Sequence, residues 1–247
     1  MQFVKMLVLA LLFAQGPSLV FDVASVKPAA PGQRGGIIRQ MPGGQRYIAN
    51  NIPLRLIMTV AYSVTDRQIS GGPSWVGTDP FDIDAKSAKP ASPDDLHTML
   101  ANLIEERFQL KIRHEQRELP IYELVVDKGG PKLKEHDPAD LDHPPMGGTP
   151  GGMEGTNVTM NYFAFTLSRN LDRNVIDKTG LMARYDLKLE FARELPPGVE
   201  RPGGNGPVGD GPTIFTALRE QLGLKLVPAK GPVDFLVIEH AEKPAEN

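Results

Sequence analysis

The side chains best suited to recognise a ligand are the arginines of two Asp-Arg pairs, Asp66-Arg67 and Asp172-Arg173. A guanidinium group can form two parallel hydrogen bonds with a carboxylate or a phosphate, so Arg67 and Arg173 are candidate ligand-binding residues. The same arginines would serve folding if each were bound to a nearby carboxylate. Trp75, the only tryptophan, is a third candidate, because an indole ring can form a binding platform as well as part of a core.

A short segment rich in acidic residues and histidine, 135–143, concentrates metal-ligand types. Imidazole and carboxylate groups bind divalent ions, and three or four of them could converge on one ion. The candidate ligands here are His136, Asp140 and His143. Glycine and proline around them favour a solvated acidic loop, so neither a metal nor a cofactor is predicted.

Other motifs lack the context that their chemistry requires. Residues 114–118 begin like the H-E-x-x-H zinc helix but have no second histidine. Residues 72–77 approach a serine nucleophile elbow with the wrong spacing, and the G-x-G-x-x-G at 204–209 contains a proline. His97 and His240 have no partner in the sequence, which predicts a helix-surface residue and a strand-end residue. No catalytic residue is therefore predicted.

Composition excludes several classes of function. The chain has 247 residues, of which 40% are hydrophobic and 23% charged, enough for a packed core. The net charge of −3 provides no basic excess for binding nucleic acid. Cysteine is absent, which removes disulfides and thiolate chemistry. The 25 glycines and 23 prolines indicate long loops.

The first twenty residues have the pattern of a signal peptide. Lys5 precedes an unbroken apolar run, Met6 to Ala14, which is too short for a membrane span of about 20 residues. Small and turn-forming residues follow at 15–18, as in a cleavage region. We therefore expect residues 1–20 to be a leader and the mature protein to be periplasmic or secreted, with no transmembrane span.

The rest of the chain divides into two halves that resemble one another. Matched blocks run in the same order through both halves, for example 51–54 with 157–160 and 66–69 with 172–175. This order predicts an internal duplication. The expected organisation has two units with a Gly/Pro/Asp-rich linker between them and a Gly/Pro-rich loop inside the second unit. The ranges are 21–130 for the first unit, 131–152 for the linker, 153–247 for the second unit and 195–212 for the loop.

The same elements are expected in each half, and together they must position the candidate residues. Apolar residues at helical spacing predict a first helix near 54–61 and near 160–171. A second helix is expected from Ser92, which can cap it, and from Pro212 to a stop at Gly223. The expected strands are those at 68–70, 81–84, 174–176 and 185–189.

A hairpin is expected to close each half. In the first half it joins 110–113 to 121–126, and in the second it joins 224–227 to 233–239. The predicted fold class is therefore α+β, with two similar units that each pack a short, mainly antiparallel sheet against two helices.

Four segments of the chain are distinctive: FDVASVKP at 21–28, LDRNVIDKTGL at 171–181, LGLKL at 222–226 and VIEHAEKP at 237–244. They resemble one family of exported proteins, which is abundant in soil acidobacteria and catalogued as a soil-associated domain of unknown function. Relatives fused to membrane sensor–peptidase modules of the antibiotic-sensing type imply an extracytoplasmic sensing or binding role. The units also look loosely like the N-terminal domains of secretins and TonB-dependent receptors, an architectural analogy only.

An extracytoplasmic binding, sensing or interaction module without catalysis is the function we expect, with a small ligand or an envelope protein as its partner. The alternative is a secreted hydrolase whose catalytic residues lie far apart in the sequence; a structural envelope component is a third possibility. A cleft in which Ser or Asp is hydrogen-bonded to His97, His114 or His240 would favour the hydrolase. An exposed apolar patch or an open sheet edge would favour the binding module.

Overall fold

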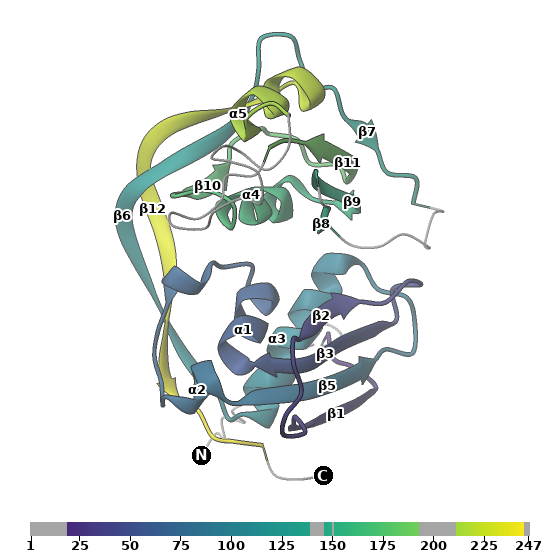
Figure 1. Cartoon of the computed structure of the whole chain (residues 1–247), viewed down its shortest axis with the longest axis vertical. Coiled ribbons are helices and arrows are strands. Elements are labelled where there is room, and N and C mark those ends of the chain that lie inside the picture. Colours follow the sequence, from purple (N-terminus) through teal and green to yellow (C-terminus); the bar gives the residue numbers. More distant parts are fainter. Residues whose placement is uncertain (1–18, 139–145, 150, 193–210, 245–247) are drawn as a thin grey trace, which may run out of the picture.

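Residues 19–138, 146–149, 151–192 and 211–244 are described by the computed structural model of the chain. They form two lobes, one above the other, joined along one side by a pair of long strands (Figure 1). None of the helices in these ranges is long and apolar enough to cross a membrane. Nearly all of the expected leader, residues 1–18, lies outside the described residues.

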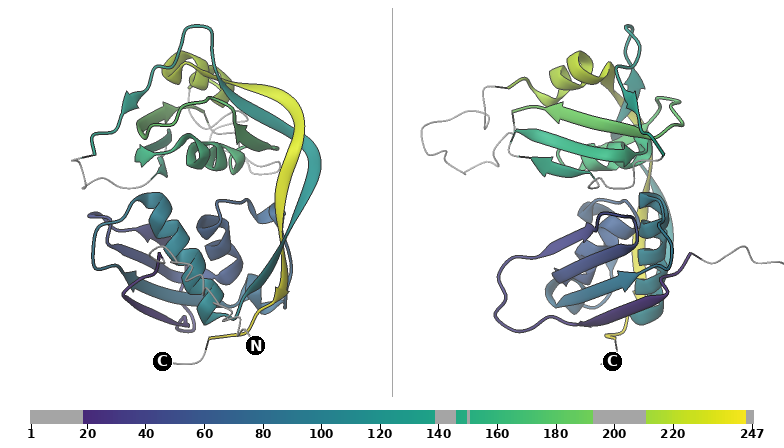
Figure 2. Two further views of the ribbon diagram at one scale, coloured as in Figure 1. Left: turned by 180° about the vertical axis from the view of Figure 1, so that it is seen from behind. Right: turned by 90° about the vertical axis from the view of Figure 1, so that its right-hand side faces the viewer.

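The first lobe is an antiparallel sheet with two helices packed on one face (Figure 2). Its strands, in spatial order, are β1 (Val23–Pro28), β5 (Pro80–Lys86), β3 (Arg46–Pro53) and β2 (Ile37–Gln40). The helices are α1 (Leu54–Ala61) and α3 (Pro93–Arg107). Ser92 caps α3, because its hydroxyl oxygen accepts a hydrogen bond from the Asp95 N–H at 3.2 Å. The predicted helix start at Ser92 is confirmed.

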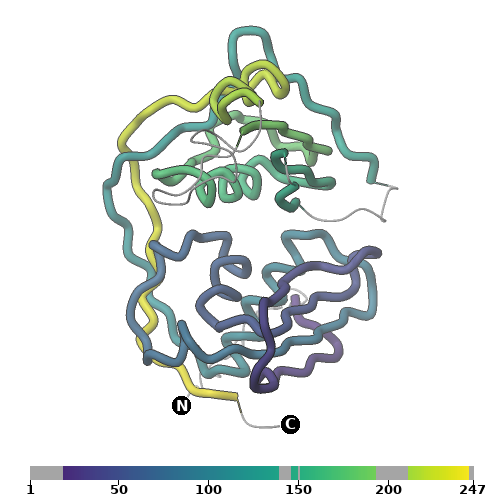
Figure 3. Tube along the Cα trace, viewed as in Figure 1, coloured from purple at the N-terminus to yellow at the C-terminus, as the bar shows by residue number. Residues whose placement is uncertain are grey.

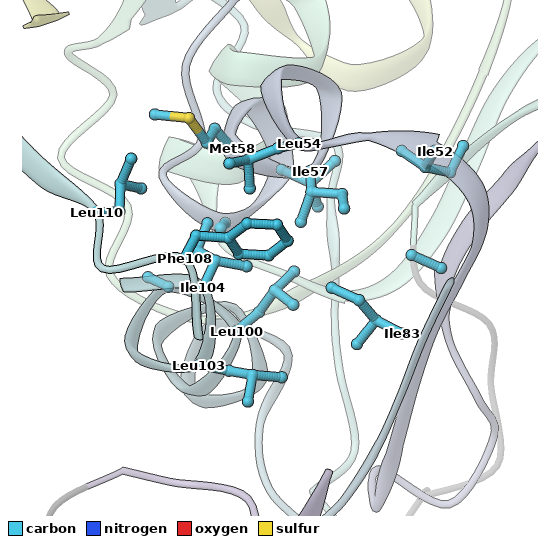
Figure 4. Close-up of a cluster of buried hydrophobic side chains, with 14 of the residues drawn as sticks. Ile52, Leu54, Ile57, Met58, Ile83, Leu100, Leu103, Ile104, Phe108 and Leu110 are labelled. Carbon is cyan, nitrogen blue, oxygen red and sulfur yellow. The ribbon is translucent and has the colours of Figure 1, made fainter. Parts of the chain in front are cut away.

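Side chains from α1 and α3 meet those of the sheet in one apolar core (Figure 4). Leu54, Ile57 and Met58 recur at helical spacing, which places them on the buried face of α1. They lie in the same cluster as Leu100 and Phe108, all of them fully buried. Each such side chain contributes roughly 1.5–3 kcal/mol through removal of its apolar surface from water.

The second lobe has its own antiparallel sheet and its own core. Its strands, in spatial order, are β7 (Lys134–Glu135), β11 (Tyr185–Glu190), β9 (Gly152–Val158) and β8 (Gly147–Thr149). The helices are α4 (Met160–Ser168) and α5 (Ile214–Ala217), which continues into a π-helical turn, η2 (Leu218–Leu222). Gly223 ends this segment with a φ of 64°, in the left-handed region that favours glycine, as predicted.

The two predicted hairpins are wrong. Each expected hairpin is instead one long strand, β6 (Lys111–Val126) and β12 (Leu224–His240). These strands pair with each other in antiparallel register over almost their whole length and run from one lobe to the other (Figures 1 and 3). Pro120 and Pro232 are tolerated within these strands because the middle of the pair is a two-stranded ribbon in which each strand has a free edge.

A third, mixed sheet is built on this ribbon. The short strand β4 (Ile69–Gly71) from the first lobe pairs in parallel with β12, and β10 (Asn174–Asp177) from the second lobe pairs in parallel with β6. The resulting order is β10-β6-β12-β4. Leu236 and Ile238 of β12 belong to the core of the first lobe, whereas Leu224 at its other end belongs to that of the second. Both lobes thus depend on the same two strands.

The α+β class is confirmed, since antiparallel and mixed sheets pack against separate helices. The elements of the two lobes follow one another in a similar order, with β3, α1, β4, β5, α3 and β6 in the first and β9, α4, β10, β11, α5 and β12 in the second. The division of the chain at residues 131–152 stays a prediction.

Candidate functional site

A cleft of about 680 Å³ lies between the two lobes. The first lobe contributes the end of α1 and residues of α3, and the second contributes α4, β10 and the loop at 181–183. The central part of the ribbon, around Gln116 and Asp234, closes it on one side. Its volume falls within the range of roughly 300–1,000 Å³ that is typical of small-molecule sites.

His97 is the most unusual side chain of the cleft lining. It lies in the second turn of α3 and is only 5% exposed, so its predicted position on the helix surface is wrong. The amide nitrogen of Gln40 lies 3.4 Å from its Nε2 atom, and its Nδ1 atom is buried without a hydrogen-bond partner among the described residues. Burial lowers the pKa of His97 to about 4, because desolvation penalises the imidazolium form. The ring is therefore neutral at physiological pH.

Two tyrosines, one from each lobe, hold the His97 ring. Tyr162 of α4 lies against it with a centroid distance of 4.9 Å, and Tyr47 of β3 meets it edge-on at 6.0 Å. Burial raises the pKa of Tyr162 to about 12, so its hydroxyl stays protonated. The His97–Tyr162 contact links the two lobes directly across the cleft.

An ion pair joins the lobes next to this aromatic contact. Arg184, which precedes β11, donates a hydrogen bond to a carboxylate oxygen of Asp94 at 2.6 Å and another to the Asn157 carbonyl oxygen at 3.2 Å. Asp94 lies in the first turn of α3, three residues before His97. The guanidinium is thus already occupied, and it holds Asp94 at the edge of the cleft.

Two aspartates, Asp177 and Asp234, line the remainder of the cleft. Asp177 accepts hydrogen bonds from the Thr179 N–H and hydroxyl through a single carboxylate oxygen, Oδ1. Asp234 of β12 has a carboxylate oxygen 2.6 Å from Nδ1 of His114, which lies on the neighbouring strand β6. Among the described residues that line the cleft, none is lysine or arginine.

Arg67 lies in a 3₁₀ turn, η1 (Asp66–Gln68), and its guanidinium binds the second lobe. It donates hydrogen bonds to the carbonyl oxygens of Ser168, the last residue of α4, at 3.2 Å and of Asp172 at 3.2 Å. A cation at the C-terminal end of a helix satisfies carbonyl groups that lack intrahelical partners. The next residue, Gln68, accepts a hydrogen bond from the Asn174 amide at 2.6 Å. Arg67 therefore lies at a contact between the lobes.

The other predicted ligand-binding residues lie elsewhere. Arg173 contacts the Asp172 carboxylate and lies 5.2 Å from the centre of the Tyr122 ring. Trp75, in α2 (Trp75–Thr78), packs against Phe81 and Phe108 at the first core and does not line the cleft. The structure thus brings Arg67 next to the segment that carries Arg173, but it does not bring Trp75 to either.

Of the three predicted metal ligands, His136 alone lies among the described residues. His136 has a buried side chain whose Nδ1 lies 2.7 Å from Asp186. This contact and Lys134 lower the pKa of Asp186 against the opposing effect of burial. Asp140 and His143 lie outside the described residues. Across the described ranges, no group of three or more His, Asp or Glu side chains is placed to hold a metal ion.

Sequence reasoning did not place His97 or Tyr162 in a binding site, and it did not predict that Arg184 would pair with Asp94 beside them. One signal was available for His97: it directly follows Leu96, and the next residues of the buried face are Met99 and Leu100. A histidine inside an apolar stripe has a buried ring. Nothing in the sequence indicated that Tyr162 would meet it from the other half of the chain.

Comparison with known proteins gives a family but no activity. The family described as "Protein of unknown function (DUF3738)" matches residues 55–241. No curated protein and no solved structure matches the chain. The match includes the second lobe and the whole ribbon, but in the first lobe it begins within α1 and leaves out β1, β2 and β3.

Proposed function

The chain belongs to the DUF3738 family of proteins of unknown function, and we propose that this protein is an extracytoplasmic binding or sensing module that holds a small molecule between its two lobes. The observation that carries the proposal is the cleft of about 680 Å³, which both lobes and the ribbon line. Sites between two units are a frequent location for ligands.

Binding without catalysis is the simpler use of this cleft. The neutral ring of His97 has no hydroxyl group bound to either nitrogen among the described residues. Ser168, which also lines the cleft, is buried, and its hydroxyl is already bound to Ala164 and Val175. An activated nucleophile requires a base within hydrogen-bond distance.

One contact favours the alternative of a secreted hydrolase. His114 Nδ1 lies 2.6 Å from the Asp234 carboxylate, the arrangement by which an acid orients a catalytic imidazole. Both side chains are about half exposed, at 59% and 43%. Turnover of an ester, peptide, glycan or β-lactam substrate that disappears in His114→Ala would establish the hydrolase in place of the binding module.

The cellular location is a proposal as well. Lys5 and the apolar run that follows it support export to the periplasm or the medium, and the resemblance noted above supports an origin in soil acidobacteria. Sequencing of the mature N-terminus should find a start between Gln15 and Phe21. An intact Met1 on the purified native protein would contradict export.

An internal duplication is the origin that we propose for the two lobes. Its support is the common order of elements and one repeated detail. Asn51 and Asn157 both have a left-handed backbone, with φ of 55° and 57°, and both N–H groups donate to an aspartate of the neighbouring strand, Asp82 and Asp186. An experimental structure in which residues 46–126 and 152–240 do not superpose with the same connectivity would refute it.

The binding function is tested by blocking the cleft. Thr98 is exposed on α3 within the cleft lining, so Thr98→Trp should fill the space between the lobes. Glu106→Trp places the same ring on an exposed site of α3 outside the lining and is the matched control. Small molecules that co-purify with the wild type and with Glu106→Trp, but not with Thr98→Trp, would support the proposal. If extracts of the wild type, Thr98→Trp and Glu106→Trp give identical mass spectra, the proposed binding function is rejected.

A further inference from the structure

We infer that the ligand of the cleft is an uncharged polyhydroxylated molecule of the saccharide class, which accepts a hydrogen bond from Nδ1 of His97. This inference rests on the proposed binding function and specifies the chemistry of the same site. It follows from the tautomer of His97, from its missing partner and from the charge of the lining.

The tautomer of His97 is fixed by Gln40. The Gln40 side-chain nitrogen donates a hydrogen bond to the Pro93 carbonyl oxygen at 3.0 Å, which settles the orientation of the amide. The same NH₂ group has a second hydrogen and faces Nε2 of His97 at 3.4 Å. Nε2 is therefore the acceptor, and in a neutral imidazole the proton then resides on Nδ1.

The Nδ1–H donor is the group that lacks a partner. It is buried, and no described residue accepts its hydrogen bond. A buried donor without a partner destabilises the folded state, and such a group in a native structure calls for an explanation. His97 lines the cleft, and Tyr162, which covers its ring, belongs to the other lobe. A molecule bound between the lobes would therefore supply the missing acceptor where the two rings part.

The charge of the lining selects an uncharged acceptor. Asp94, Asp177 and Asp234 line the cleft, and none of the described lining residues is lysine or arginine. Asp94 is paired with Arg184 and Asp234 contacts His114, so Asp177 is the lining carboxylate that an anionic ligand would meet without a basic partner among the described residues. A hydroxyl or amide oxygen can accept the His97 hydrogen bond without this repulsion.

The same lining offers acceptors for the donors of a polyhydroxylated ligand. Asp177 has its Oδ1 occupied by Thr179, and no described lysine, arginine or histidine forms a salt bridge with it. The amide groups of Gln116 and Asn161, both exposed in the lining, can donate as well as accept. A sugar hydroxyl both donates and accepts, and it therefore matches carboxylate, amide and imidazole groups together.

Two substitutions distinguish the loss of the Nδ1–H donor from the loss of the imidazole ring. In His97→Asn the side-chain amide occupies the region of Nδ1 and can donate, whereas in His97→Gln it reaches the region of Nε2 and leaves Nδ1 without a substitute. The full chain is titrated by calorimetry with N-acetylglucosamine, cellobiose and maltose. Inorganic phosphate and spermidine serve as the anionic and cationic comparisons. The NMR signal of the His97 Nδ1 proton is followed during each titration.

The expected result is that at least one saccharide binds the wild type and moves the Nδ1 proton signal. His97→Gln should weaken that binding about tenfold or more, and His97→Asn should retain it within about threefold. If no saccharide binds, and phosphate or spermidine binds in a way that Thr98→Trp abolishes, the ligand class is overturned and the proposed binding function remains. Saccharide binding that is unchanged in His97→Gln would overturn the role of Nδ1. Absence of binding by all five probes would overturn the inference, whereas the co-purification experiment above still decides the binding function separately.

Discussion

Replacing His97 should change how the stability of the protein depends on pH. The folded state holds His97 neutral until about pH 4, whereas an unfolded histidine binds a proton at about pH 6.5. As the pH falls below the unfolded value, the unfolded state therefore takes up a proton that the folded state does not. Stability from this residue is fully present above about pH 6.5 and is lost as the pH falls towards about 4.

The magnitude follows from the two pKa values. Between about pH 7 and about pH 5, the free energy of unfolding should fall by about 2 kcal/mol through His97 alone, and by about 3 kcal/mol once both states are protonated. This change precedes the titration of aspartates whose pKa is lowered by an ion pair, such as Asp84 and Asp186, because they lose their charge at lower pH.

Urea unfolding at a series of pH values measures this effect. His97→Gln and His97→Asn cannot titrate, so both should lose about 2 kcal/mol less than the wild type between about pH 7 and about pH 5. The comparison uses the slope with pH rather than the stability itself, because either substitution also removes the contact with Tyr162. Parallel curves for the three proteins would refute the argument that His97 is buried in its neutral form.

Three other substitutions test the architecture. Arg67→Ala should lower the free energy of unfolding in urea by about 1–2 kcal/mol, because it leaves the carbonyl groups at the end of α4 without their partner. Arg173→Ala removes a surface contact and should cost under about 1 kcal/mol in the same measurement. Equal losses would contradict the different roles of the two arginines. Gly223→Ala should cost more than about 1 kcal/mol, measured as a lower Tm, because the residue has a φ of 64° and an added Cβ would meet the Gly130 carbonyl group; an unchanged Tm would show that the turn can relax. Ser92→Ala should cost about 1 kcal/mol in urea unfolding by removing the cap of α3, and Ser92→Asp should restore it.

Local patterns were sufficient to predict the helices and most short strands. Leu54, Ile57 and Met58 show the helical period, and Ser92 followed by Pro93 marks the start of α3. These signals act within a few residues and survive in any tertiary context that buries the apolar face. The expected end of the first helix in the second half was less accurate, since α4 stops at Ser168 before Leu171.

The long strands and the cleft could not be predicted in the same way. Polar residues at 114–118 and Pro120 interrupt the apolar pattern of β6, because this part of the ribbon leaves the cores and lies between the lobes. The same pattern is typical of a turn, which explains the hairpin interpretation. The cleft requires His97 and Tyr162 to come together from different halves, and only the three-dimensional structure specifies that meeting.

The course of β12 has a consequence for the order in which the protein can fold. Its far end supplies Leu236 and Ile238 to the first core, and the Glu242 N–H donates a hydrogen bond to the Phe108 carbonyl oxygen at 2.7 Å. During synthesis from the N-terminus, the first lobe therefore emerges from the ribosome long before the strand that completes it. Contacts between residues so distant in the chain slow folding, because a long loop must close before they form. Until then β4 presents an unpaired edge, which a chaperone or a second nascent chain could occupy.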